Sequence, residues 1–292
     1  MVRPDFEFNR KRADAVRYDQ NQPNISRISM TLLHAVLLGL IQGMTEFLPV
    51  SSSGHLAMTQ HLLPGFEQPG ILFDVLLHLG TMLAVILYFR RDLGNLLSSP
   101  FRKDEEAALH RRLLLLLIAG SVPTAIIGLT FKDVFEGMFE NIPLVGLMLL
   151  VTGTLLFVSE KFRRGKRKEK DLTLLDALVV GTVQGAAIIP GISRSGSTIA
   201  ALLLRGVDGE TAARFSFLLA LPAVFGAALL SLRDLHAVPA GEFPLYLTGT
   251  AVAFAAGMFS IHFLLAVIRK RRLFAFALYC WLAGSLALTL TL

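Results

Sequence analysis

The amino-acid sequence predicts an all-α polytopic membrane protein with an inverted-topology repeat, formed by six transmembrane helices and two re-entrant helix hairpins. Three observations predict this fold class. Apolar residues make up 53% of the chain and charged residues only 17%, with a mean hydropathy of +0.60, which is typical of integral membrane proteins. Long apolar runs recur along the chain, and two polar motifs repeat at a constant spacing.

The first 29 residues are interpreted as a flexible N-terminal extension, because they are charged and lack the apolar core of a signal peptide. Residues 30–292 are expected to form a single membrane domain, with repeat one over about 30–160 and repeat two over about 173–292. The net charge of +6 comes from basic clusters between apolar runs, which indicates loops facing anionic lipid rather than nucleic-acid binding. The single cysteine, Cys280, excludes an intrachain disulfide framework.

Six apolar runs are long enough to cross a bilayer, which takes about 20 helical residues. They lie at 71–89, 113–131, 142–159, 210–231, 245–268 and 273–291. Two further apolar regions, 31–63 and 173–205, are each interrupted by proline, glycine and serine. Irregular backbone at membrane depth is tolerated only where it is buried in protein or lines a cavity. We therefore expect both regions to form re-entrant hairpins of helix, loop and helix.

The two hairpin regions match each other at a constant shift of 142 positions. The register continues without a gap through Phe73 and Phe215 to Arg91-Asp92-Leu93 and Arg233-Asp234-Leu235. Because each repeat holds one hairpin and three crossings, the second copy enters the membrane upside down, which makes an inverted repeat. The matching hairpin pairs are Gly39 and Gly181, Gln42 and Gln184, Gly43 and Gly185, Ser51 and Ser193, Ser53 and Ser195, and Gly54 and Gly196.

Three connections rich in Lys and Arg, at 90–112, 161–170 and 269–272, alternate with loops that contain almost none. The positive-inside rule makes these three connections cytoplasmic. The first hairpin then enters the membrane from outside and the second from inside, so their polar tips are expected to meet near the midplane. The basic N-terminal extension would lie outside, against the same rule, but three loops outweigh one tail.

The second polar tip, PGISRSGST from Pro190 to Thr198, has the composition of a phosphate-binding site. Free N–H groups and the positive dipole at the start of a helix attract anions. Arg194 adds a planar fork suited to phosphate, and Ser193, Ser195 and Thr198 add hydroxyl donors. An arginine at membrane depth costs about 2.5 kcal/mol or much more, and it is therefore a functional residue by default.

The first polar tip lies in LIQGMTEFLPVSSSGHLAM, from Leu40 to Met58, and carries reactive groups. Glu46 is a candidate base, and His55 is a candidate nucleophile or acid. One tip is thus expected to bind phosphate and the other to react. Small residues in membrane helices also serve close packing, which is the competing interpretation of Ser51 and Ser195 and the preferred one for the hairpin glycines. The serines at this turn are Ser51, Ser52 and Ser53.

The motifs QGMTEFLPVSSSGH and PGISRSGST closely resemble the two signature motifs of the bacterial undecaprenyl-diphosphatases, the bacitracin-resistance family of integral membrane phosphatases. The resemblance extends from Met30 to Leu292 and includes the stretch FSFLLALP. It implies hydrolysis of undecaprenyl diphosphate to undecaprenyl phosphate and inorganic phosphate, which recycles the lipid carrier of peptidoglycan synthesis. It also implies a divalent cation, Mg²⁺ or Ca²⁺, and an active site open to the outer leaflet of the bacterial inner membrane.

By the same resemblance, Glu46 corresponds to the catalytic glutamate of the family, His55 to its essential histidine and Arg194 to the arginine of its second motif. Gln42 stands where the family alternates between Glu and Gln, so it can coordinate a metal beside Glu46 but cannot act as a base. Attack on the phosphorus by Ser52, by His55 or by water stays open. The residues assigned to phosphate binding are Ser51, Ser53, Ser193, Ser195, Thr198 and Gln42.

Three histidines, His34, His61 and His262, are interpreted as hydrogen-bonding groups between helices. Asp74 and His78 lie one helical turn apart, and they are either a buried polar pair or a second layer of residues around the site.

Transport or flipping of a lipid-linked phosphate or another anion is the competing function, because broken helices in an inverted repeat also form secondary transporters. The asymmetry between the two tips favours hydrolysis. The sequence is compatible with a homodimer but does not specify the oligomeric state.

Overall fold

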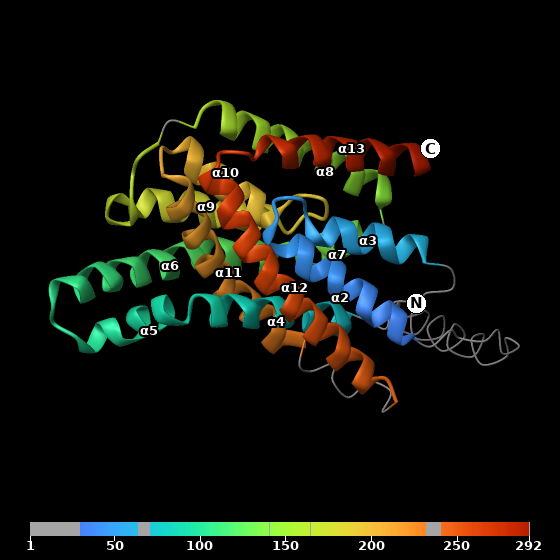
Figure 1. Ribbon diagram of the computed structural model, residues 1–292, viewed down its shortest axis with the longest axis horizontal. Helices are drawn as coiled ribbons and strands as arrows, with labels where there is room; N and C mark the ends of the chain where they lie inside the picture. The colour runs from blue at the N-terminus through green and yellow to red at the C-terminus, as the bar shows by residue number, and fades with distance from the viewer. Residues whose placement is uncertain (1–29, 64–70, 140, 164, 232–240, 292) are drawn as a thin grey trace, which may run out of the picture.

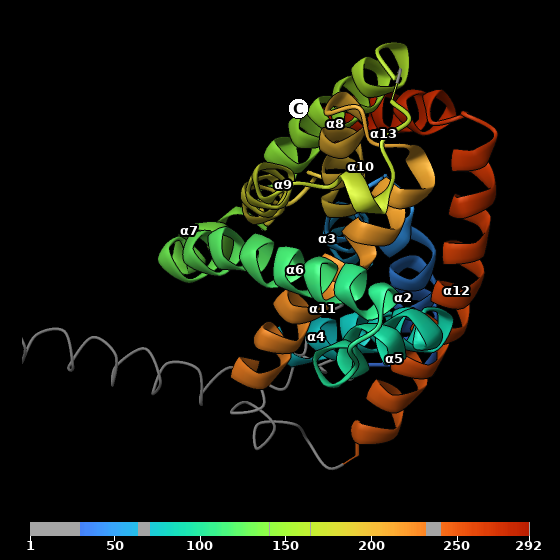
Figure 2. The same ribbon diagram turned by 90° about the vertical axis from the view of Figure 1, so that its left-hand side faces the viewer.

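The computed structural model describes residues 30–63, 71–139, 141–163, 165–231 and 241–291. Within these ranges the chain is helical, and its one β-type contact is an isolated bridge between Arg167 and Val207. Figure 1 shows the long helices gathered around two broken ones, and Figure 2 shows α12 along one flank with α8 and α13 across the top. The predicted N-terminal extension and the segment Arg233-Asp234-Leu235 lie outside the described residues.

Helices occupy all six ranges that were predicted to cross the membrane. Four of them, α6, α8, α11 and α12, are long and apolar enough to span a bilayer, which confirms a polytopic membrane protein. Helix α4 reaches that length only together with α5 (Arg90–Ser98), across a bend of 76°. Helix α13 is a shorter apolar helix. The six helices are α4 (Ile71–Tyr88), α6 (Glu105–Thr130), α8 (Ile142–Lys161), α11 (Gly209–Ser231), α12 (Phe243–Arg269) and α13 (Phe274–Thr291).

Both interrupted regions form a helix, a break and a second helix, as predicted. The breaks contain Pro49 and Pro190, which lack an N–H and restrict the residue before them. Ser51 has a positive φ of 69° in the first break, and Gly191 has a φ of +92° in the second. The first hairpin consists of α2 (Leu32–Phe47) and α3 (Ser52–Leu62), and the second of α9 (Leu174–Ala186) and α10 (Arg194–Leu204).

The second helix of each hairpin begins with the same cap. The Ser51 hydroxyl accepts a hydrogen bond from the Gly54 N–H at 3.2 Å, and the Ser193 hydroxyl accepts one from the Gly196 N–H at 3.0 Å. Serine is favoured at this position because its oxygen satisfies an N–H group that has no partner in the first turn. The repeated motif therefore builds the same local structure twice.

The glycines of α2 and α9 allow a long helix of the other repeat to lie directly against each hairpin. A Cβ atom at Gly39 would lie 2.5 Å from a carbonyl oxygen of α12, and one at Gly181 would lie 1.9 Å from a carbonyl oxygen of α6. Gly43 and Gly185 are similarly close to side chains of α12 and α6. Consequently α12 packs along α2 and α6 packs along α9, which confirms the predicted role of these glycines.

The two breaks touch each other, so the expected meeting of the polar tips is present in the structure. The Ser195 hydroxyl donates to the Leu48 carbonyl oxygen at 3.2 Å, and a Cβ atom at Gly196 would lie 3.0 Å from the Cβ of Pro49. The Arg194 guanidinium pairs with the Glu46 carboxylate across 148 positions of sequence. The fold thus brings the reactive tip and the binding tip into one cluster.

Candidate active site where the two hairpins meet

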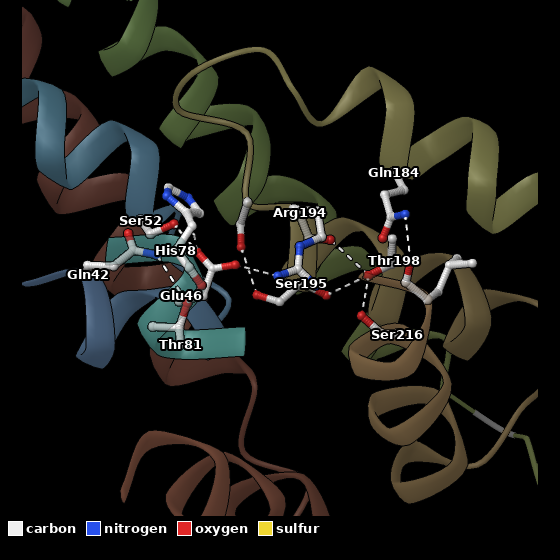
Figure 3. A network of polar contacts seen from close by, with 12 residues as sticks. Gln42, Glu46, Ser52, His78, Thr81, Gln184, Arg194, Ser195, Thr198 and Ser216 are labelled. Atoms are coloured by element: carbon white, nitrogen blue, oxygen red, sulfur yellow. Dashed lines mark hydrogen bonds and ion pairs between the residues drawn. The ribbon is translucent and has the colours of Figure 1, made fainter. Parts of the chain in front are cut away.

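Glu46 lies at the end of α2, is only 6% exposed, and holds the cluster together. One carboxylate oxygen, Oε1, accepts from Nη2 of Arg194. The other, Oε2, accepts from the Ser52 hydroxyl at 2.6 Å and from the Gln42 amide at 3.0 Å (Figure 3). A buried carboxylate is costly unless it is paired and hydrogen-bonded, so these donors stabilise the ionised form of Glu46.

Arg194 is the first residue of α10, and its side chain is 17% exposed. Its Nη2 is bound to Glu46, while the buried Nη1 has no hydrogen-bond partner among the residues that the structure describes. A buried donor without a partner costs free energy that a ligand can recover. With one nitrogen held and the other free, the guanidinium is oriented to receive a phosphate oxygen.

Gln42 is fully buried one helical turn before Glu46. Its amide nitrogen donates to Glu46 and lies 3.5 Å from the Thr81 hydroxyl. Its amide oxygen, Oε1, has no partner within the described part of the chain. The cluster therefore has a free donor on Arg194, for an anion, and a free acceptor on Gln42, for a cation or another donor.

His78 lies beside this cluster, whereas Asp74 does not reach Glu46 through its carboxylate. The Nε2 of His78 lies 3.6 Å from Oε2 of Glu46, and its Nδ1 lies 2.8 Å from the Asp74 carbonyl oxygen on the same helix, α4. The Asp74 carboxylate instead accepts from the Gln60 amide at 3.0 Å. The spacing of four residues indicated a shared helix face, but which of the two side chains would reach Glu46 was not visible in the sequence.

Both ring nitrogens of His55 contact groups other than the Glu46 carboxylate. Its Nδ1 lies 2.7 Å from the Ser51 carbonyl oxygen, and its Nε2 lies 2.7 Å from the Tyr279 hydroxyl. The His55 and Tyr279 rings are also stacked, 5.5 Å apart at 11°. Because a carbonyl oxygen only accepts, Nδ1 carries the proton and Tyr279 donates to Nε2. Tyr279 escaped the sequence analysis because it lies 224 positions away, in α13.

The predicted phosphate-binding hydroxyls fall into two groups. Ser51 and Ser193 are helix caps, each 3.3 Å from the hydroxyl of the serine two residues later, Ser53 or Ser195. Thr198 lies on the other side of Arg194 from Glu46 in Figure 3, with its hydroxyl 2.5 Å from that of Ser216 and 2.8 Å from the Arg194 carbonyl oxygen. The structure brings Ser52 to Glu46, but it does not bring Thr198 there.

Hard cations prefer oxygen ligands, and the site offers Oε2 of Glu46 and the free Oε1 of Gln42. Across the described ranges, no group of three or more His, Cys, Asp or Glu side chains is close enough to hold a metal. A cation at this site would have the Glu46 carboxylate and the Gln42 amide oxygen as its oxygen ligands.

The fold and the site together define an integral membrane protein with a buried cluster of arginine, carboxylate and serine, suited to a phosphate group. The chain matches the sequence model of a family described as "Bacitracin resistance protein BacA" over residues 35–286.

The names of similar proteins agree with this family match. The chain is 62% identical over 257 residues to an undecaprenyl-diphosphatase of Syntrophotalea carbinolica, covering 88% of this chain and 98% of that protein. It is 44% identical over 278 residues to an undecaprenyl-diphosphatase of Alkaliphilus metalliredigens, covering 90% and 100%. It is 42% identical over 263 residues to undecaprenyl-diphosphatase 4 of Bacillus thuringiensis, covering 89% and 98%. The chain therefore belongs to the bacitracin resistance protein BacA family.

Proposed function

We propose that this protein is an enzyme that hydrolyses undecaprenyl diphosphate to undecaprenyl phosphate and inorganic phosphate. The activity is the one named in its relatives, which are up to 62% identical. The observation that carries the proposal is the Ser52 hydroxyl 2.6 Å from a Glu46 oxygen, on the carboxylate that also holds Arg194. The names of these relatives do not support the transporter alternative.

Ser52 is the nucleophile in this proposal, and Glu46 is its base. The Ser52 oxygen attacks the terminal phosphorus while its proton passes to Glu46, and the bond from that phosphorus to the bridging oxygen breaks to release undecaprenyl phosphate. Water then attacks the phosphoserine, and Glu46 returns the proton to the departing Ser52 oxygen. Both protons of the water leave on the released phosphate, as H₂PO₄⁻, and Glu46 is again a carboxylate.

His55 is the weaker candidate for the nucleophile because both of its ring nitrogens are engaged. Nδ1 faces the Ser51 carbonyl oxygen, and Nε2 faces the Tyr279 hydroxyl, each at 2.7 Å. Attack by Nε2 would require the Tyr279 hydrogen bond to break first. The Ser52 hydroxyl already points at a carboxylate that can take its proton.

The diphosphate binds at the start of α10. The free Nη1 of Arg194 receives an oxygen of the terminal phosphate, while Nη2 stays on Glu46. Since the Glu46 carboxylate already balances the charge of Arg194, a diphosphate needs further positive charge at this site. A divalent cation, Mg²⁺ or Ca²⁺, held by oxygens of Glu46 and Gln42, supplies that neutralisation when bound.

Phosphate release by the detergent-purified protein from a long-chain prenyl diphosphate, with and without EDTA, tests this function. Ser52→Ala should lower kcat by at least about 100-fold, because a nucleophile is lost. The matched control is Ser159→Ala on α8, which should keep wild-type activity. Its buried hydroxyl donates to the Leu156 carbonyl oxygen at 2.9 Å and has no other hydrogen bond within the described ranges. Ser52→Ala activity within a few-fold of wild type would eliminate Ser52 as nucleophile. No release by the folded wild type would overturn the function.

The membrane arrangement belongs to the same proposal: six crossings, an inverted repeat and a site open to the outer leaflet of the bacterial inner membrane. The reciprocal packing of α12 on α2 and of α6 on α9 supports the repeat. In Figure 1 the basic α5–α6 and α8–α9 connections lie at the left-hand end, while α3 and the start of α12 lie to the right. This separation of charge supports a cytoplasmic left-hand end.

An impermeant thiol reagent applied to whole cells tests the orientation. Gly241→Cys, an exposed position before α12 where a Cβ atom meets nothing within 4 Å, should be labelled. Lys103→Cys, exposed in the basic α5–α6 connection, should be labelled only after the cells are opened. The native Cys280 is buried and gives no background. The reverse labelling pattern would invert the proposed topology.

A further inference from the structure

We infer that His78 is a third ligand of the divalent cation, through its Nε2, beside the carboxylate of Glu46 and the amide oxygen of Gln42. The inference rests on the proposed function only in placing a cation at this site. It adds a nitrogen to a set of oxygen ligands, and it therefore changes which cations the site prefers.

The distance between the His78 and Glu46 side chains is suited to two ligands of one ion. Nε2 of His78 lies 3.6 Å from Oε2 of Glu46, which is too long for a hydrogen bond. Metal–ligand bonds to histidine nitrogen and carboxylate oxygen are about 2.0–2.2 Å, so two neighbouring ligands of one ion lie roughly 2.9–3.6 Å apart. The observed separation equals the upper end of this range, so the imidazole and the carboxylate have the spacing of two ligands that share one ion.

The orientation of the His78 imidazole is also suited to binding a metal through Nε2. Nδ1 of His78 lies 2.8 Å from the Asp74 carbonyl oxygen, which can only accept, so Nδ1 carries the ring proton. In the neutral ring, Nε2 then presents its lone pair toward Glu46. Histidine ligands of metals commonly donate their other ring N–H to a backbone carbonyl, which fixes both the tautomer and the direction of the ring. The α4 backbone thus orients His78 as a ligand before any ion arrives.

The Gln42 side chain supplies the remaining ligand, an amide oxygen. Its Oε1 is buried and has no partner in the described residues. Because Nε2 is the amide atom that faces Glu46, a half-turn of the amide group brings Oε1 to an ion bound there. Gln184, the counterpart in the second repeat, has a similarly free Oε1, but Ile188 stands there in the position of Glu46. The position that matches His78 is Ala220, so at these described positions the first repeat alone combines the free amide oxygen with a carboxylate and an imidazole.

This ligand set predicts a preference among cations. Carboxylate and amide oxygens suit Mg²⁺, Ca²⁺ and Mn²⁺, whereas imidazole favours transition metals over Ca²⁺. A site of one nitrogen and two oxygens should therefore bind Mn²⁺ more tightly than Ca²⁺. Removing the imidazole should bring the two affinities closer together.

Electron paramagnetic resonance with Mn²⁺ as the probe tests the inference on the full-length, detergent-purified protein without substrate. Electron spin echo modulation should show ¹⁴N coupling to the bound Mn²⁺ in the wild type and lose it in His78→Gln. Titration of the free Mn²⁺ signal should give a Kd at least about tenfold higher in His78→Gln. The matched control is His262→Gln, whose ring faces Tyr88 at 3.4 Å and should keep both the coupling and the affinity.

A second pair of variants uses the repeat as an internal control. Gln42→Met removes the free oxygen at nearly constant volume and should weaken Mn²⁺ binding, whereas Gln184→Met should not. Absence of ¹⁴N coupling in the wild type, or its persistence in His78→Gln, would overturn the role of His78 as a ligand. Because no substrate is present, these outcomes are separate from the phosphate-release assay, which alone decides the proposed function.

Discussion

The two hairpins have the same backbone design but different chemistry. Each breaks at a proline, caps its second helix with a serine and lies against a long helix of the other repeat. The first residue of that second helix is Ser52 in one hairpin and Arg194 in the other. The attacking hydroxyl and the phosphate-binding guanidinium of the proposed mechanism thus occupy equivalent positions. A repeated backbone frame presents two different side chains at the same place.

The position of Glu46 shows the same contrast. Its counterpart in the second hairpin is Ile188, and the Gln184 amide is bound instead to Thr124 at 3.3 Å and to the Leu219 carbonyl oxygen at 3.2 Å. The second hairpin therefore supplies Arg194 to the carboxylate of the first and has no carboxylate of its own at this place. One buried cluster arises from two copies of the motif.

Replacement of the Glu46 carboxylate should show the largest functional difference between the two hairpins. Glu46→Gln keeps the shape of the side chain but removes the base and the charge that holds Arg194, so kcat should fall by about 100- to 10,000-fold. Ile188→Val, at the equivalent position, should stay within a few-fold of wild type. Phosphate release by both purified variants measures the difference, and equal losses would mean that the two hairpins contribute alike.

Arg194→Lys should have the next largest effect. A lysine cannot hold Glu46 and a phosphate oxygen with two fixed nitrogens, and a lost charged hydrogen bond is worth about 1.5–3 kcal/mol. The value of kcat/KM should therefore fall by about 10- to 100-fold. Arg269→Lys, an exposed position at the end of α12, provides the control. Unchanged kcat/KM in Arg194→Lys would mean that only the positive charge at this position matters and that the two nitrogens of the guanidinium do not.

Helix packing distinguishes the hairpins by stability. Gly181→Ala should destabilise the fold by about 1–3 kcal/mol, because its Cβ would lie 1.9 Å from a backbone oxygen of α6. Gly39→Ala should cost less, since the corresponding distance to α12 is 2.5 Å. Gly226→Ala, exposed on α11 with nothing within 4 Å, should not destabilise. Thermal unfolding midpoints in one detergent rank the three, and a different order would contradict the packing argument.

Tyr279→Phe should have the smallest effect. The variant keeps the ring stacked on His55 but removes the hydroxyl that donates to Nε2, a neutral hydrogen bond worth about 0.5–1.5 kcal/mol. If that bond positions His55 for the reaction, kcat/KM should fall by about 2- to 10-fold. The pH profile of kcat/KM should change with it, because Nε2 becomes free to accept a proton. An unchanged profile would leave Tyr279 with a packing role alone.

Much of the site was predictable because the motif residues lie on short helices beside the breaks. Glu46, Ser52 and Arg194 were identified from the sequence, and the structure brings them together. The contacts of His55 and His78 were not predictable, because they depend on α13 and α4 packing against the first hairpin. Thr198 also belongs to the second motif, but its position on α10 turns it toward Ser216.

The sequence by itself determined the membrane class, the two broken helices and the close packing at the hairpin glycines. These features follow from local properties: hydropathy over about 20 residues, the missing N–H of proline and the absence of a Cβ in glycine. Only the tertiary structure decided which side chains share the buried space around Glu46. Arg194 is 148 positions from Glu46, and Tyr279 is 224 positions from His55, so their contacts depend on how the helices pack rather than on any local pattern.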